Sequence, residues 1–462
     1  MAMLGKRRPS RRHSGHSGLA RSPAASSAQA SPAEEDNRVT IERLAHDGRG
    51  VAHLASGKTL FVDQALPGET VKVAIHRTRK RFDEAHLKAI EVASPQRIEP
   101  PCAHFGHCGG CDLQHLSIDA QRAHKRQVVS ELFARQGVAL DRPIQALDTQ
   151  TQAYRRRARL GVKVDSHGQV LLGFRAKDTH RLVNIHTCMV LVPALQALLA
   201  PLHGLLGQLE APRHVGHIEL ISTQDSCVVL VRQLREHAAD KARWQAFADS
   251  QAVALGTLLG REAPELNWYG APPVLQDIHD DLTLAFAPGD FLQVNAEVNQ
   301  KVIAQVLAWL AITPDQQVLD LFAGIGNFSL PLAAAGAAVQ AVEGSATMVA
   351  RITANAHTNH LAVAAMQADL NQPEAVAALL AERRLDAVVL DPPRSGAETV
   401  CQALGRHPVK RVVYVSCDPA TLARDAAQLV QAGYRVVEVA VADMFLHTAH
   451  METLVLFEHR HG

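Results

Sequence analysis

The sequence predicts an α/β protein with a Rossmann-like domain in its carboxyl-terminal part, a small β-barrel near its amino terminus and an α+β domain between them. In the carboxyl-terminal part, valine-rich apolar runs such as residues 318–322 and 412–415 alternate with helical stretches. That alternation is typical of parallel sheets. Near the amino terminus, short strands are separated by closely spaced turn pairs, a pattern that favours a barrel. The turn pairs are Asp47-Gly48, Ser56-Gly57 and Pro67-Gly68.

Composition narrows the classes of function. The chain has 462 residues, 47% of them hydrophobic, and 47 basic side chains against 46 acidic ones. Binding of nucleic acid must therefore come from local basic patches. There is no export signal and no apolar run of membrane-spanning length, so we expect a cytoplasmic protein without membrane contact. Nothing indicates an obligate protein partner, and we expect a monomer.

Seven cysteines are too few for a disulfide framework, which points to metal binding or catalysis.

The first two segments of the chain differ in whether we expect them to fold. Residues 1–37 are rich in small residues with scattered arginines, and we expect a disordered basic tail. It is either an arm that touches phosphate or a tail without function. Residues 38–92 read as short strands and resemble the TRAM domain, an OB-like RNA-binding barrel. On that barrel, Arg77, Arg79, Lys80 and Arg81 form either an RNA-contacting edge or an ordinary solvated charge run.

Four cysteines mark the central domain, residues 93–275. Cys102, Cys108 and Cys111 have the spacing C-x5-C-x2-C, and Cys188 follows after a long interval. Four thiolates suit zinc or an iron–sulfur cluster. Structural zinc sites usually show two pairs of cysteines, so one triple with a distant fourth favours a [4Fe-4S] cluster.

An arginine-rich run lies between these cysteines. Tyr154 is followed by four arginines within five positions, a composition that predicts a surface for RNA phosphates and stacked bases. A solvated strand face is the alternative. The apolar runs 195–209 and 243–259 predict two amphipathic helices.

A glycine-containing turn follows the predicted strand 318–322. Gly324 and Gly326 let the backbone lie close against a nucleoside, and Glu343 ends the next strand, where it can accept hydrogen bonds from a ribose diol. A dinucleotide and S-adenosylmethionine both suit such a site. The dinucleotide fingerprint needs a small residue where Phe328 stands, and the run instead resembles the D-x-F-x-G-x-G-x-F signature of class I methyltransferases. That resemblance implies S-adenosylmethionine.

Two acidic residues follow further strands. Asp369 is expected beside the adenine, and a helix cap is the alternative. Asp391 begins the run Asp-Pro-Pro-Arg at the cleft where substrate and cofactor meet. Enzymes that methylate exocyclic amines carry an aromatic residue where Arg394 stands, so the sequence favours another target.

Cys417 is the candidate nucleophile. It lies between the strand 412–415 and a predicted helix start, and we expect the backbone N–H groups of that helix to stabilise a thiolate. If the target is a carbon, such as C5 of a pyrimidine, it becomes nucleophilic only after a thiolate adds to C6. A base must later remove the C5 proton, and Glu452, just before the last predicted strand, is the candidate.

Residues 293–457 resemble the RNA uracil-C5 methyltransferases, and the TRAM and cysteine features resemble the type that acts on a single-stranded or loop uridine of 23S ribosomal RNA. The resemblance implies a methyltransferase domain over residues 276–462. One alternative is the same chemistry on another ribosomal uridine or on transfer RNA. The other is a non-catalytic RNA-binding role in ribosome assembly. The resemblance implies Cys417 as nucleophile, Glu452 as base, a cofactor site of Gln293, Phe322, Asn327, Glu343, Asp369 and Asp391, and a [4Fe-4S] site of Cys102, Cys108, Cys111 and Cys188.

Overall fold

The computed structural model describes residues 37–177, 179–224, 226–260, 264–381 and 384–460. The predicted basic tail, apart from Asn37, lies outside these ranges.

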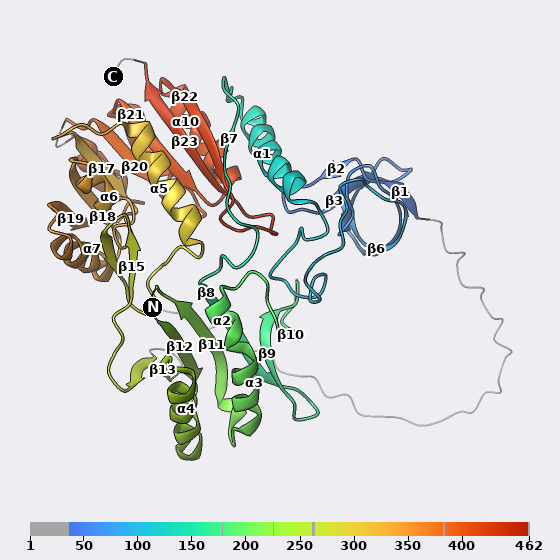
Figure 1. The fold of residues 1–462 in the computed structure, drawn as a ribbon. Helices are drawn as coiled ribbons and strands as arrows, with labels where there is room; N and C mark the ends of the chain where they lie inside the picture. The colour runs from blue at the N-terminus through green and yellow to red at the C-terminus, as the bar shows by residue number, and fades with distance from the viewer. Residues whose placement is uncertain (1–36, 178, 225, 261–263, 382–383, 461–462) are drawn as a thin grey trace, which may run out of the picture. The chain divides into compact units, whose positions relative to one another are not determined.

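The first described segment is a curled six-stranded sheet with the order β1-β5-β6-β4-β3-β2 (Figure 1). The two ends of the sheet are joined by the residues between β1 and β2. Ile41 N donates to Glu69 O at 2.9 Å, and Glu42 N donates to Val51 O at 2.8 Å. Alternate residues such as Leu60 and Val62 fill its core. The predicted barrel is confirmed. Its strands are β1 (Arg38–Thr40), β2 (Arg43–Leu44), β3 (Gly50–His53), β4 (Thr59–Asp63), β5 (Thr70–Thr78) and β6 (Phe82–Val92).

A seven-stranded sheet forms the centre, with the order β10-β9-β8-β11-β12-β13-β14. Its strands are β8 (Arg157–Val164), β9 (Val170–Arg175), β10 (Leu182–Asn184), β11 (Val215–Ser222), β12 (Cys227–Gln233), β13 (Ala254–Leu259) and β14 (Glu265–Tyr269). Leucines of α3 and Trp244 of α4 pack on it. The helices are α2 (Pro193–Ala197), α3 (Leu199–Gln208) and α4 (Ala238–Gln251), and a 3-10 turn η1 spans Pro212–His214.

Two helix predictions in this segment are corrected. The run 195–209 is divided between α2 and α3. The run 243–259 is helical only to Gln251, because Ala252 takes a left-handed conformation with φ 51° and ends α4. The rest is β13, which pairs in parallel with β12. Apolar periodicity cannot separate a buried strand from a helix over such a short run.

The carboxyl-terminal sheet has eight strands in the order β19-β18-β17-β20-β21-β23-β22-β7. The strands from β19 to β21 are parallel, and β23 runs antiparallel to both its neighbours. The chain order reverses between β17 and β20, which is where open α/β sheets bind their ligands. The strands are β17 (Gln317–Leu321), β18 (Ala338–Glu343), β19 (Val363–Gln367), β20 (Ala387–Leu390), β21 (Arg411–Ser416), β22 (Tyr434–Ala442) and β23 (Glu452–His459).

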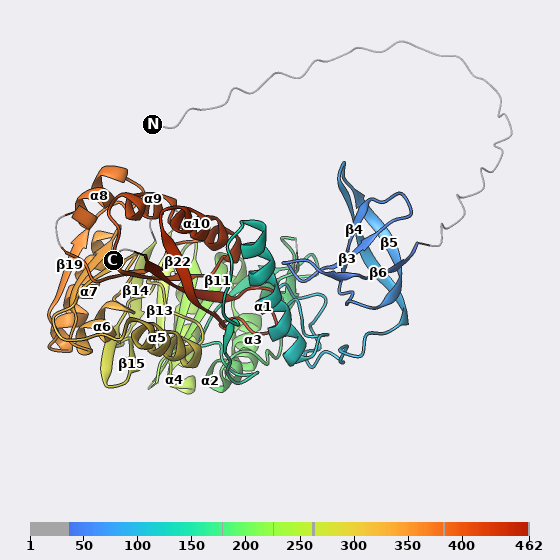
Figure 2. The ribbon, with the colours of Figure 1, turned by 90° about the horizontal axis from the view of Figure 1, so that it is seen from above.

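Helices cover both faces of this sheet (Figure 2). On one face lie α8 (Pro373–Ala381), α9 (Glu398–Arg406) and α10 (Pro419–Gln431), and on the other α5 (Ala296–Leu310), α6 (Ser329–Ala334) and α7 (Ala346–Thr358). The hairpin of β15 (Gln276–His279) and β16 (Leu282–Ala285) is held against α7 by Asn355 and Asn359.

Part of the expected central domain belongs to this sheet. Helix α1 (Ile118–Arg135) packs on α10, and β7 (Gln145–Leu147) is the edge strand beside β22. Phe133 of α1 lies in the same buried cluster as Tyr434 of β22. Among the described helices, none combines the length and apolar character needed to cross a membrane.

Candidate active site

One cavity of about 650 Å³ opens where the strand order reverses, at the carboxyl ends of β17 and β20. Its walls come from the glycine turn after β17, the ends of β18 and β20, and the first residue of β23. All six residues expected at the cofactor, and both residues expected to carry the chemistry, line this one cavity. These are Gln293, Phe322, Asn327, Glu343, Asp369, Asp391, Cys417 and Glu452.

The glycine turn forms the floor of the cavity. Gly324 and Gly326 have φ of 58° and 98°, a left-handed backbone that favours glycine. A Cβ built on Gly324 would meet nothing within 4 Å, so the backbone there faces open space. Glu343 accepts from Gly324 N through one oxygen and from Ser345 N through the other, both at 3.1 Å. Each oxygen keeps a lone pair, which fits the hydroxyls of a ribose.

Two further polar residues frame this end of the cavity. Asn327 exchanges a pair of side-chain hydrogen bonds with the buried Asn299 of α5, at 2.8 and 3.1 Å. Asp369 is exposed, and its carboxylate accepts from Asn371 and Gln372 immediately before α8. Asp369 therefore lines the cavity and also organises the start of a helix, so both interpretations of this residue are compatible with its position.

Three acids gather at the strand ends. Asp320 on β17 is fully buried and accepts from Ser329 Oγ at 2.5 Å. Burial, and secondarily the charge of Glu343, raises its pKa to about 7. Burial and the neighbouring Asp320 raise the pKa of Asp391 to about 7 as well. Burial and Asp391 raise the pKa of Glu452 well above its ordinary value. Such a site favours a positively charged ligand, because a cation would relieve the repulsion among the acids.

Cys417 follows β21 and precedes α10, as predicted. The expected stabilisation of its thiolate by the N–H groups of α10 is wrong, because Asp418 caps the helix and accepts from Ala420 N and Thr421 N at 3.0 Å. Burial, then Glu452 and Asp391, raise the pKa of Cys417 to about 11, and Arg394 opposes them. Cys417 is therefore a thiol at neutral pH in the described state, and Arg394 is the neighbour that favours its ionisation.

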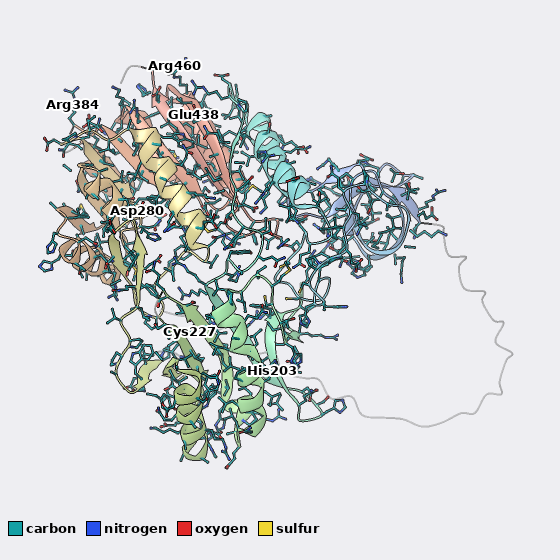
Figure 3. The ribbon with its side chains drawn as sticks, in the orientation of Figure 1. His203, Cys227, Asp280, Arg384, Glu438 and Arg460 are labelled. Carbon is teal, nitrogen blue, oxygen red and sulfur yellow. The ribbon has the colours of Figure 1, made fainter. Side chains whose placement is uncertain are left out.

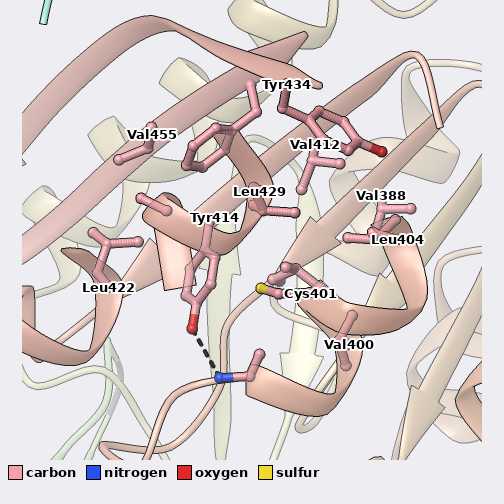
Figure 4. Close-up of a cluster of buried hydrophobic side chains, with 14 of the residues drawn as sticks. Val388, Val400, Cys401, Leu404, Val412, Tyr414, Leu422, Leu429, Tyr434 and Val455 are labelled. Atoms are coloured by element: carbon pink, nitrogen blue, oxygen red, sulfur yellow. Dashed lines mark hydrogen bonds between the residues drawn. The ribbon is translucent and has the colours of Figure 1, made fainter. Parts of the chain in front are cut away.

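A buried carboxylate joins the loop after β20 to α10. Asp425 accepts from the Tyr414 hydroxyl at 2.7 Å and from Ala397 N at 2.8 Å. Ala397 N also lies 3.0 Å from the Tyr414 oxygen (Figure 4). Arg424 binds the other oxygen of Asp425. This cluster fixes the Asp-Pro-Pro-Arg loop relative to the helix that begins after the cysteine.

Glu452 is the first residue of β23. Because β23 runs antiparallel to β21, with Thr453 opposite Ser416, Glu452 lies at the end of the sheet where Cys417 begins its loop. The preceding loop is held by α1, through an ion pair of 2.6 Å between the buried Lys125 and Asp443.

The comparisons with known proteins agree with this geometry. Residues 117–460, well over half of the chain, match the tRNA (Uracil-5-)-methyltransferase family. The chain belongs to the uracil-C5 methyltransferase family. Residues 35–88 of this methyltransferase match the TRAM domain, so the expected methyltransferase fold with a TRAM domain is confirmed.

The methyltransferase has close relatives along nearly its whole length. It is 55% identical to a Halomonas elongata protein named 23S rRNA (uracil(1939)-C(5))-methyltransferase RlmD, with 99% of this chain and 97% of that protein covered. A Vibrio cholerae protein of the same name is 43% identical, with 91% and 95% covered. The fold resembles that of a Pyrococcus abyssi tRNA (uracil-54, C5)-methyltransferase, with a TM-score of 0.73, 22% identity, and 91% and 100% of the two chains covered.

The four cysteines expected to bind the cluster line a separate cavity of about 320 Å³. None is in a disulfide. Burial raises the pKa of Cys111 to about 12, and the charges of Cys188 and Cys108 add to that. Gly109 lets this loop approach β9, since an added Cβ would lie 2.9 Å from Arg175 O. In the described ranges, no group of three or more His, Cys, Asp or Glu side chains is arranged to hold a metal ion. Four cysteines beside one cavity are the number of ligands that a [4Fe-4S] cluster would need, because each iron takes one thiolate.

The other cysteines are separate from this group. Cys227 lies on β12 of the central sheet (Figure 3) and Cys401 is buried in α9. Neither is among the residues that line the two cavities.

A third cavity, of about 670 Å³, reaches Cys417 from the side of the barrel. Arg49, Arg77 and Lys177 line it together with Arg394. Arg77 belongs to the predicted RNA-contacting run, whereas Arg49 does not. The Arg49 guanidinium lies 4.6 Å from the ring centre of Phe61. The run from Arg77 to Arg81 is exposed, and its contact with RNA stays a prediction.

The arginine-rich run differs most from its predicted role. Tyr154 is buried and donates its hydroxyl to Leu446 O at 3.0 Å, so it is not free to stack on a base. Arg157 is paired with Glu219 at 2.6 Å, and Arg156 is buried. The prediction that this run forms an RNA-contacting surface is wrong for the buried Tyr154 and Arg156, and it stays a prediction for the half-buried Arg157. Their partners lie far along the chain, so no local pattern could have revealed them.

Some residues beside the cofactor cavity had no predicted role. Asp320, the first residue of the methyltransferase signature, is the fully buried member of the acid group. Phe291 lines the same cavity with 68% of its surface exposed. An exposed phenylalanine beside a ligand cavity has no sequence signal that separates it from a core phenylalanine.

Proposed function

We propose that this methyltransferase uses S-adenosylmethionine to methylate C5 of a uridine in 23S ribosomal RNA, at the position that its relatives' names give as uracil 1939. The observation that supports this most strongly is that Cys417 and Glu452 line the same cavity as the residues of the glycine turn. A cavity that joins a thiol, a carboxyl and a nucleoside site suits methylation of a pyrimidine carbon. The names of the full-length relatives support the RNA.

In the proposed mechanism, the Cys417 thiol first loses its proton to solvent, and the thiolate then adds to C6 of the uracil, which makes C5 nucleophilic. S-adenosylmethionine supplies the methyl group. Glu452 then removes the proton from C5, and the bond between Cys417 and C6 breaks to release the product. Arg394 opposes the rise in the pKa of Cys417 that burial, Glu452 and Asp391 cause, so its positive charge favours the attacking thiolate.

The cofactor residues have separate roles in this proposal. Glu343 binds the ribose and Asp369 lies beside the adenine. Gln293, Phe322, Asn327 and Asp391 line the remainder of the site. The fixed backbone holds the two reactants in line, which is the main contribution of the fold.

Covalent capture tests the function. The purified protein is incubated with 5-fluorouridine-substituted 23S RNA and S-adenosylmethionine, because fluorine at C5 prevents the final elimination. We expect a denaturant-stable complex that maps to Cys417. The Cys417→Ala variant should form no such complex. The control is Cys227→Ala, which changes a half-buried cysteine of the central sheet and should form the complex normally. With ordinary RNA, Glu452→Gln should accumulate the adduct.

The possible results distinguish the alternatives. Capture of transfer RNA in place of 23S RNA would keep the chemistry and refute the substrate. Adduct formation by Cys417→Ala would refute the nucleophile, and free release of RNA by Glu452→Gln would refute the base. Cofactor binding without capture of either RNA would favour a non-catalytic role in assembly.

We also propose that Cys102, Cys108, Cys111 and Cys188 bind a [4Fe-4S] cluster. The support is their shared cavity and their soft thiolate ligands. Iron and sulfide analysis of protein purified without oxygen should give four of each per chain. Cys188→Ser should lose them, and Cys227→Ser should keep them.

The domain organisation is likewise a proposal. We infer a TRAM barrel over residues 38–92, a central domain over 93–275 from which α1 and β7 join the methyltransferase sheet, and a methyltransferase domain over 276–462. We further infer a monomer without an obligate protein partner that acts in the cytoplasm. Sedimentation of the purified chain at micromolar concentration should give the mass of one chain, and a dimer mass would refute the monomer.

A further inference from the structure

Arg156 reaches the cofactor cavity from outside the methyltransferase sheet. Among the described residues that line this cavity, it is the one that precedes residue 276. Its backbone is fixed on both sides, because Arg156 N donates to Val294 O at 3.0 Å and Arg156 O accepts from Ser222 N at 2.8 Å. The side chain therefore enters the cavity from a rigid position at the start of β8.

The guanidinium of Arg156 is only partly satisfied. Nε donates to Gln293 O at 2.9 Å, and Nη1 lies 2.5 Å from Asp277 Oδ1. The arginine is 7% exposed and Asp277 is 4% exposed. Nη2 is buried and has no hydrogen-bond partner in the part of the chain that the structure describes. A buried donor on a charged group is costly when it is unpaired, so a ligand atom is its natural partner.

Asp277 holds this guanidinium in place. Its second oxygen lies 2.8 Å from Nε2 of the buried His279. The ring of His279 lies 3.4 Å from Asn299 Nδ2, and Asn299 is the partner of Asn327. A continuous polar chain thus runs from Arg156 to the glycine turn, and its ends lie on the same cavity.

We propose that Arg156 binds the α-carboxylate of the methionine part of S-adenosylmethionine, with Asp277 as the residue that positions it. This rests on the proposed function. The cofactor has one carboxylate, and the unpartnered Nη2 can donate a charge-assisted hydrogen bond to it. The acids Asp391 and Glu452 line the same cavity, where they suit the sulfonium. The two charged ends of the cofactor would then find opposite charges within one cavity.

Calorimetric titration with two ligands whose sulfur is an uncharged thioether tests the proposal. S-adenosylhomocysteine keeps the amino-acid end, and 5′-methylthioadenosine lacks it. For Arg156→Met in the full-length protein, we expect binding of S-adenosylhomocysteine to weaken by about 10- to 100-fold, the value of a hydrogen bond to a charged group. Binding of methylthioadenosine should not change. Arg156→Lys keeps the positive charge but changes the position of its donors. It should therefore weaken binding of S-adenosylhomocysteine less than Arg156→Met does.

Arg157→Met is the matched control. Arg157 is the next residue, is paired with Glu219 and Asp290 O, and is not among the residues that line the cavity. It should bind both ligands as the unaltered protein does. If Arg156→Met fails to fold, Arg156→Lys carries the test, and the selective loss of affinity for S-adenosylhomocysteine is still expected.

Three results would overturn the proposal. Equal weakening of both ligands would indicate a structural role for Arg156. Unchanged binding of S-adenosylhomocysteine together with lost capture of 5-fluorouridine RNA would indicate that Arg156 faces the uracil. Unchanged binding with normal capture would indicate no role at the site. Failure of the unaltered protein to bind S-adenosylhomocysteine would refute the proposed function itself.

Discussion

Replacing Tyr414 by phenylalanine tests whether Asp425 ties the loop after β20 to the helix that follows Cys417. The Tyr414 hydroxyl donates to Asp425 at 2.7 Å, and both residues are fully buried. The carboxylate keeps the N–H of Ala397 and the guanidinium of Arg424 as donors. The substitution thus removes one hydrogen bond to a charged group and leaves no buried group unpaired. We expect the free energy of unfolding to fall by about 1.5–3 kcal/mol.

Two measurements follow this change. Urea unfolding gives the loss of stability from the shift in midpoint at constant slope. The rate of covalent capture with 5-fluorouridine RNA gives the effect on the site, and we expect it to fall because the Asp-Pro-Pro-Arg loop is less firmly held.

Tyr434→Phe is the control, since Tyr434 is equally buried in the same cluster (Figure 4). Its hydroxyl accepts from Val409 N at 2.8 Å, remote from the loop. The loss of stability should be similar, about 1–3 kcal/mol, with no change in capture. An unchanged stability for Tyr414→Phe would refute the hydrogen-bond argument. Lost stability with an unchanged capture rate would refute the positioning argument.

Three further predictions use other parts of the sheet. Gly326→Ala should abolish cofactor binding in calorimetry, because φ is 98° and the new Cβ would lie 2.3 Å from Leu330 Cδ1; normal binding would show that the turn adapts. Lys125→Met should destabilise the protein by about 3–5 kcal/mol in urea unfolding, because it deprives the buried Asp443 of its main partner; a loss below about 1 kcal/mol would contradict this. Asp320 has a pKa raised from 3.8 to about 7, so ionising it in the folded state reduces stability as pH rises through that window. Asp320→Asn should therefore gain stability relative to the unaltered protein between about pH 4 and 7, and a pH-independent difference in thermal melting would count against the raised pKa.

The sequence predicted the parts of the fold that depend on local pattern. The strand before Cys417 and the glycine turn after β17 are both present, because buried parallel strands read as β-branched runs that end in small or polar residues. The cap of α10 was also visible in principle, since Asp418 before a proline is a common helix start. Asp418 accepts the N–H groups of Ala420 and Thr421, which is why they do not serve Cys417.

Features that depend on distant partners were not predictable. Arg156 stands in a basic run, and only the fold brings Asp277 to it. The strand β7 has three residues and no periodicity, and it exists because β22 offers it a parallel edge. A short strand of this kind has no signal of its own, because its partner supplies the hydrogen bonds that define it.

The position of α1 and β7 has a consequence for the synthesis of the chain. Both leave the ribosome long before β22, whose Ala440 pairs with Gln145, and before α10, on which α1 packs. Their apolar side chains, Phe133 among them, must wait for the last quarter of the polypeptide before they can be buried. Until then the growing chain exposes apolar side chains of α1 that the folded protein buries, Val128 and Phe133 among them, and exposed side chains of this kind favour aggregation. Folding of the catalytic sheet can therefore be completed only after translation is almost finished.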